Sequence, residues 1–158
     1  MLKSYLLTFL ISMVPLVELR GAIPFGMAAV NPPLPLLHAY VVSILGNMVP
    51  VPLIYLFARK ILLWGRNKPL IGRPFCYLLS RGEAVGKKWT EKNGQSLYLA
   101  LLLFVGIPLP GTGAWTGTLA ASLLDLDFKK STLAVMGGVL LAGLIVGILS
   151  SAGIQVLK

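Results

Sequence analysis

Two uncharged runs constrain this chain most, because each is long enough to cross a lipid bilayer. Residues 34–58 and 131–157 are 25 and 27 residues long and contain no Asp, Glu, Lys or Arg. About 20 helical residues, rising about 1.5 Å each, cross a hydrocarbon core about 30 Å thick. Because 56% of all residues are hydrophobic and only 12% are charged, the sequence predicts an all-α integral membrane protein, multi-pass in the plasma (inner) membrane.

The basic residues are concentrated in one polar stretch between the two halves of the chain. Nine of the 14 Lys and Arg residues fall within 59–95, and basic loops of membrane proteins stay on the cytoplasmic side. Within it, 74–92 has apolar residues at helical spacing, which predicts an amphipathic helix lying on anionic lipid. The alternative is a plain basic loop. This placement of the charge favours membrane lipids over nucleic acid as partners.

The chain is predicted to be one membrane domain with two similar halves, 1–58 and 96–158, joined by the connector 59–95. Each half has a short apolar arm, a break rich in Pro and Gly, a second short arm and a full-length span. The arms and breaks are 4–17, 18–24 and 22–30 in the first half and 96–107, 108–113 and 114–124 in the second. Interrupted segments at matching positions indicate a transporter built from inverted repeats.

Two topologies fit this order. Arms of 9 to 14 residues reach only about 14–21 Å, and Pro15, Pro24, Pro108 and Pro110 each remove a helical hydrogen bond. These features favour re-entrant hairpins, which enter from opposite faces and meet at mid-depth, where irregular backbone must be buried or line a cavity. The alternative has four spans, with each broken segment crossing as one kinked helix.

The first break carries the only charges between Lys3 and Arg59, namely Glu18 and Arg20. A charge at mid-bilayer costs at least about 2.5–3.5 kcal/mol, so such residues usually face a cavity or a partner. We expect Arg20 to bind an anion and Glu18 to carry a proton, with Gly21 and Pro24 shaping the backbone beside them. The alternative is a structural clamp in which the two charges neutralise each other or reach an interface.

The second break is uncharged, and its residues predict a binding surface of backbone amides. Helix starts near 22–24 and 111–114 would expose N–H groups and a positive dipole end to an anion. Thr112 is a candidate cap for the second arm. Close packing of one hairpin on the other is an equal alternative. The candidate residues here are Pro108, Pro110, Gly111, Thr112, Gly113 and Trp115.

Three features outside the breaks also need an interpretation. Asn47, one turn before the Pro50 kink, is expected to line the cavity or to satisfy freed backbone. Asp125 and Asp127 predict a solvated turn. Small residues at four-residue spacing in the last span allow close helix approach, either within the chain or in a homodimer; they are Gly138, Ala142, Gly143 and Gly147.

Several classes of function have little support. The chain has one cysteine, Cys76, and one histidine, His38, so a His/Cys metal site is not expected. No second carboxylate, His cluster or Ser–Lys pair accompanies Glu18 within the apolar segments. We therefore expect neither an enzyme nor a bound cofactor.

Both breaks resemble a known family. The segments VPLVELRGAIPFGMA (14–28) and PLPGTGAWTGTLAASLL (108–124) closely resemble the paired signatures of the small multidrug export protein family, which is similar to the DedA superfamily. That resemblance implies two opposed re-entrant hairpins with an acidic residue, here Glu18, in the first. The arginines typical of the second DedA hairpin are absent from 108–114, and we expect Arg20 to provide the positive charge in their place.

The resemblance implies a small secondary transporter. Some DedA-type proteins are implicated in proton-dependent translocation of undecaprenyl phosphate and other phospholipids, so an amphipathic or lipid-linked phosphate is the leading expected substrate, with protons as the coupling ion. A proton-coupled exporter of hydrophobic cationic drugs is the first alternative. A non-transporting membrane scaffold is the second.

The two topologies differ in the location of the chain ends. Hairpins place both ends outside the cell, whereas four spans place both in the cytoplasm. We expect Leu2→Cys and Lys158→Cys, each with Cys76→Ser, to be labelled in intact cells by a membrane-impermeant thiol reagent. Labelling that requires permeabilised cells at both positions would rule out the hairpins.

Overall fold

The structure is a computed structural model that describes all residues except 67–76, 78–79, 81–90, 92–93, 110 and 157–158. All regular secondary structure in the described residues is helical, as the sequence predicts. The predicted amphipathic helix at 74–92 lies almost wholly outside the described residues. Pro110 of the second break also lies outside them.

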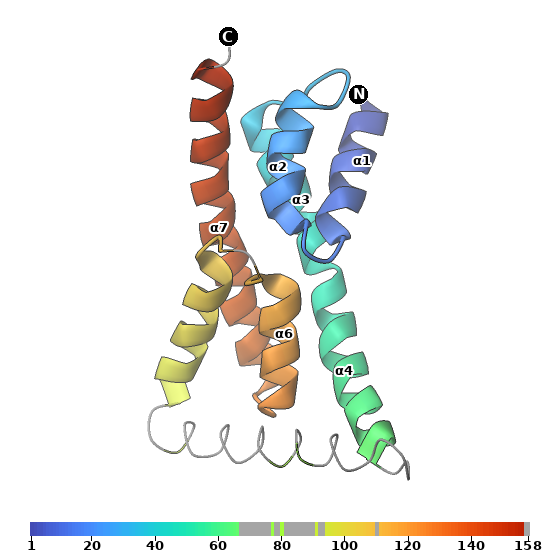
Figure 1. Cartoon of the computed structure of the whole chain (residues 1–158), viewed down its shortest axis with the longest axis vertical. Coiled ribbons are helices and arrows are strands. Elements are labelled where there is room, and N and C mark those ends of the chain that lie inside the picture. The colour runs from blue at the N-terminus through green and yellow to red at the C-terminus, as the bar shows by residue number, and fades with distance from the viewer. Residues whose placement is uncertain (67–76, 78–79, 81–90, 92–93, 110, 157–158) are drawn as a thin grey trace.

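The first two helices form a hairpin that occupies half the length of the molecule. Helix α1 (Leu2–Met13) runs from one end to mid-height and α2 (Glu18–Ala28) returns to that end (Figure 1). The predicted break at 18–24 is wrong, because the turn covers 14–17 and Pro24 lies inside α2. Pro15 cannot donate a helical hydrogen bond, and Leu16, with φ 70°, reverses the chain.

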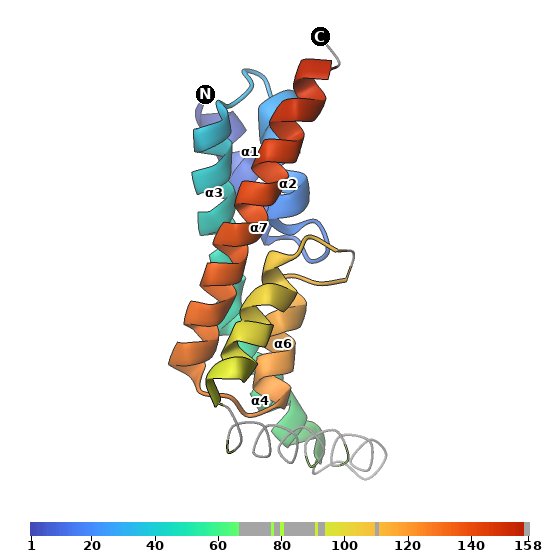
Figure 2. The ribbon, with the colours of Figure 1, turned by 90° about the vertical axis from the view of Figure 1, so that its left-hand side faces the viewer.

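Two long apolar helices confirm the predicted full-length segments. Helix α3 (Leu36–Met48) continues through Val49, which keeps helical dihedral angles, into α4 (Pro50–Arg66). Within them, Leu36–Ile61 is long and apolar enough to cross a bilayer. The same holds for Phe128–Gly153 of α7 (Phe128–Val156), which spans nearly the full height of the molecule in both views (Figures 1 and 2).

The second hairpin lies at the opposite end from the first. It consists of the short apolar helix Gly94–Gly106 and α6 (Ala114–Leu123), and both of its helices point their connecting turn towards mid-height (Figures 1 and 2). The N-terminus and the last described turn of α7 lie at the end of the first hairpin (Figures 1 and 2). The two helical hairpins with turns at mid-height agree with the predicted order of elements, while their re-entrant position in a membrane and the equivalence of the two halves as inverted repeats stay predictions.

The main apolar core joins both hairpins to the long helices. Its fully buried side chains include Leu19 and Ile23 of α2, Val51 of α4, Val105 of the second hairpin and Val139 of α7. Because these residues come from both halves of the chain, the two hairpins share one core.

The small residues of α7 are used for packing within the chain. A Cβ at Gly138 would lie 2.7 Å from Val105, and one at Gly143 would lie 2.6 Å from the ring of Tyr40. Gly147 faces Leu36, and Ala142 is buried. The internal alternative therefore accounts for this face, and a homodimer stays a prediction.

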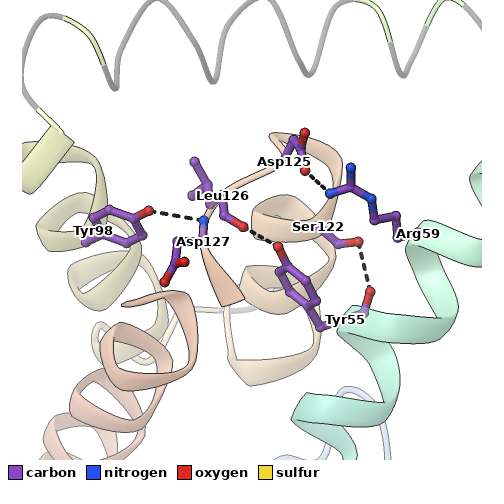
Figure 3. Close-up of polar contacts among 7 residues, drawn as sticks. All are labelled: Tyr55, Arg59, Tyr98, Ser122, Asp125, Leu126 and Asp127. Carbon is purple, nitrogen blue, oxygen red and sulfur yellow. Dashed lines mark hydrogen bonds and ion pairs between the residues drawn. The ribbon is translucent and has the colours of Figure 1, made fainter. Parts of the chain in front are cut away.

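A group of polar contacts fastens α4 to the α6–α7 turn at the connector end (Figure 3). The Tyr55 hydroxyl donates to the Leu126 carbonyl, the Ser122 hydroxyl donates to the Tyr55 carbonyl at 3.1 Å, and Arg59 pairs with Asp125. A second carboxylate of this turn, at position 127, accepts the Lys130 amide at 2.9 Å and so caps α7. The turn is thus not merely solvated, because both carboxylates have specific partners.

Close contact between α1 and α3 requires a glycine at position 46. A Cβ there would lie 2.0 Å from Ser12 Oγ and 2.4 Å from the Phe9 carbonyl oxygen, and the backbone atom cannot move aside. We expect Gly46→Ala to destabilise the protein by about 1–3 kcal/mol, measured by SDS-induced unfolding. Gly153→Ala, with nothing within 4 Å of its Cβ, should be neutral. Equal stability of the two variants would contradict this packing.

Candidate functional site

The centre of the candidate site is the carboxylate of Glu18, which caps a helix of the other hairpin. Its Oε2 accepts the Ala114 amide at 3.2 Å and its Oε1 accepts the Trp115 amide at 3.0 Å. The cap residue of α6, Gly113, has no side chain to do this. A carboxylate at a helix N-terminus satisfies unpaired N–H groups and meets the positive end of the helix dipole. Glu18 is only 4% exposed, so these bonds form in a buried place.

Gly113 is required at this junction for two reasons. Its φ of 147° belongs to a region that is essentially restricted to glycine, and a Cβ would lie 2.1 Å from Glu18 Oε2. Gly111 also has a positive φ, 85°, but open space surrounds the place of its Cβ. Gly113 therefore leaves room for the carboxylate, whereas Gly111 only shapes the turn.

Arg20 also binds the second break, through hydrogen bonds from its guanidinium. Its guanidinium donates to the Leu109 carbonyl through Nη1 and, through Nη2, to Thr112 Oγ1 at 2.8 Å and to the Ile107 carbonyl at 3.4 Å. The Thr112 hydroxyl lies 2.9 Å from both carbonyl oxygens and has one proton to donate. The prediction that Thr112 caps α6 is therefore wrong, because its hydroxyl bonds the turn and Glu18 supplies the cap.

The two charges of the first hairpin hold different parts of the second hairpin. Residues two apart on a helix point to different sides, and the described residues contain no direct Glu18–Arg20 ion pair. Both side chains instead cross to the break between Gly106 and Ala114. Glu18 accepts from backbone amides and Arg20 donates to carbonyls and a hydroxyl, all of which are uncharged groups. The two side chains therefore clamp the hairpins together. The sequence also allowed a clamp in which the two charges neutralise each other, and this arrangement differs from it.

The other residues predicted for the site lie on the same elements as this clamp. Gly21 lies over Val17, within the first turns of α2, and Pro24 lies farther along the same helix. Residues 22–24 are therefore not a helix start, so the anion site predicted there is wrong. Pro108 lies in the second break.

Two predicted residues have buried polar atoms with no hydrogen-bond partner among the described residues. The amide of Trp115 is bonded to Glu18, but its indole Nε1 is buried without a partner, as are both side-chain polar atoms of Asn47.

The acceptors that Arg20 contacts at positions 107 and 109 are backbone carbonyls, which a pattern of side chains in the sequence cannot reveal. The described residues contain no group of three His, Cys, Asp or Glu suited to a metal ion.

Comparison with known proteins identifies the class and then the family. Two helices long and apolar enough to span a bilayer, together with the buried Glu18 carboxylate, are typical of a membrane protein. A family model described as "Putative small multi-drug export protein" matches residues 18–145. The chain therefore belongs to this family, and the matched residues include Glu18, Arg20 and the groups of the second hairpin that they contact. No curated protein and no solved structure matched the chain.

The contact between Glu18 and Gly113 can be tested by a double-mutant cycle. We expect Gly113→Ala to lower the free energy of unfolding by about 2 kcal/mol or more, from overlap and backbone strain. In a Glu18→Ala background the overlap is gone, so the same change should cost clearly less. Gly111→Ala, the control, should cost about 1 kcal/mol in both backgrounds. An equal cost of Gly113→Ala in both would contradict the contact.

Proposed function

We propose that this protein is a small proton-coupled secondary transporter in which the Glu18 junction is the gate. The proposed substrate is an amphipathic or lipid-linked phosphate such as undecaprenyl phosphate. The observation that carries the proposal is the capping of α6 by a buried carboxylate from the other hairpin. Such a junction is sensitive to one proton and to competing anions.

The proton would act by weakening the cap. An ionised carboxylate accepts both amide hydrogens through charge-assisted bonds, and protonation removes the charge that strengthens them. The hairpins would then separate, exposing the amides at positions 114 and 115. Arg20, which holds only uncharged acceptors, would become free for an anion.

A phosphate suits the groups that this separation exposes. Amides at a helix N-terminus bind phosphate oxygens, and a guanidinium binds them in a bidentate manner. The phosphate and the Glu18 carboxylate would therefore compete for the same two amides. Binding of one would favour release of the other, and this competition couples the proton to the substrate.

The proposal includes an orientation and an assembly. The basic connector would lie in the cytoplasm, so the two hairpins would be re-entrant elements of inverted repeats in the plasma membrane. A homodimer would associate through lipid-facing surfaces, because the small residues of α7 already pack inside the chain.

Proton-coupled export of hydrophobic cationic drugs is the second candidate, favoured by the description of the family. There, Glu18 would exchange a proton for the cation, and the neighbouring Arg20 would oppose cation binding. A membrane scaffold, the remaining alternative, needs no titrating residue, so Glu18→Gln would leave its function intact.

Proteoliposomes with an imposed pH gradient distinguish these candidates. Uptake of a lipid-linked phosphate and of a cationic dye would be compared for wild type, Glu18→Gln and Arg20→Ala. We expect gradient-driven phosphate uptake by wild type and a loss of at least tenfold in both variants. Lys3→Ala, an exposed change on α1, is the matched control and should transport normally.

The other outcomes reject the leading proposal in different ways. Uptake of the dye alone, lost in Glu18→Gln, would establish the second candidate. The absence of transport for both substrates would favour the scaffold. Phosphate uptake that is unchanged in Arg20→Ala would show that this guanidinium does not bind the anion.

A further inference from the structure

A line of buried polar side chains runs along α1. Ser4, Thr8 and Ser12 repeat at four-residue spacing, which places them on one helical face, and each is at most 1% exposed. The Thr8 and Ser12 hydroxyls donate to carbonyls of their own helix, whereas Ser4 Oγ has no partner among the described residues. Sequence reasoning missed these residues, although their spacing was visible.

Helix α3 contributes a second line of the same kind. Ser43 and Asn47 are one turn apart, and both are at most 1% exposed. Ser43 Oγ and both polar atoms of the Asn47 amide have no hydrogen-bond partner within the described part of the chain. A carboxamide can make up to four hydrogen bonds, so Asn47 has the largest number of unmade hydrogen bonds in the two lines.

The two lines meet in a seam between α1 and α3. Ser12 Oγ would lie 2.0 Å from a Cβ at Gly46, the residue before Asn47. Nearer the N-terminus, Thr8 approaches the place of a Cβ at Gly26 of α2 to 2.9 Å, where the Ala39 Cβ of α3 lies 3.4 Å away. The seam therefore runs from the terminal end of the molecule to the turn that precedes Glu18.

The terminal end of the seam carries a titratable pair. The Tyr5 hydroxyl lies 2.6 Å from His38 Nδ1, which links α1 to α3 close to Ser4 in sequence. His38 is exposed, so it is in contact with the surroundings of the molecule at the start of the seam. Polar groups are thus present from the surface to mid-height.

Unpaired buried polar groups need an explanation, because each costs about 1–3 kcal/mol. Small hydroxyl residues alone are explained by close packing of membrane helices. That explanation does not extend to an asparagine amide with two unpaired heavy atoms. Water is the usual partner of such groups in protein interiors, since one molecule satisfies two to four of them.

We propose that the seam of Ser4, Thr8, Ser12, Ser43 and Asn47 is a hydrated route that carries protons from the terminal face to Glu18. The inference rests on the proposed function, which requires a proton to reach a buried carboxylate. With the connector in the cytoplasm, the terminal face is external, so protons would enter from outside. Water bound between the hydroxyls and the Asn47 amide would relay them.

Thiol labelling tests the hydration of the seam without any transport measurement. In a Cys76→Ser background, Ser43→Cys and Asn47→Cys would be treated with 2-aminoethyl methanethiosulfonate in proteoliposomes. The reagent reacts with thiolates, which form in water. We expect both to react at least tenfold faster than Ala121→Cys, an equally buried position of the apolar core. Rates equal to this control would overturn the proposal, and Ser43→Cys decides alone if Asn47→Cys does not fold.

A second measurement tests the proton relay itself. Ser43→Val should slow gradient-driven uptake at least tenfold and leave substrate exchange without a pH gradient unchanged, because only proton delivery is impaired. Leu53→Ala, an exposed apolar position of α4, is the control. Equal slowing of both processes would show a structural role and overturn the relay. A transport-inactive wild type with reactive seam cysteines would reject the proposed function while retaining the hydrated seam.

Discussion

The arrangement of the two hairpins depends on one interaction, a buried carboxylate that caps a helix distant in sequence. The free N–H groups of α6 need an acceptor, and its own cap residue is a glycine. Glu18 supplies the acceptor from the first hairpin, while Arg20 fixes the carbonyls of the same turn. Each hairpin thus satisfies polar groups of the other, which is what low-dielectric surroundings demand of irregular backbone.

Much of the fold could be predicted, because length and hydropathy determine it. The two full-length apolar segments and the start of α6 at Ala114 follow from the uncharged runs and the glycines. The sequence predicts the first turn too late in the chain, because Pro24 suggests a break there. A proline inside a helix removes one hydrogen bond, and packing of α2 against α1 and α3 offsets that loss.

The site could be predicted in part. Glu18, Arg20 and the amides at the start of α6 were identified from the cost of intramembrane charge and from the helix N-terminus, but their direct contact was not. A single sequence contains no signal for pairing between residues 96 positions apart. Thr112 looked like a cap because threonine prefers that position, yet the carbonyls of its own turn and Arg20 engaged the hydroxyl instead.

The distance in sequence between Glu18 and its amide partners has a consequence for biogenesis. The first hairpin is synthesised before residues 114 and 115 exist, and chains are completed at about 5–20 residues per second. For several seconds the carboxylate and the guanidinium therefore lack their final partners. The first half of the protein completes its polar contacts only after the second half has arrived, so assembly of the two halves is a late step of folding.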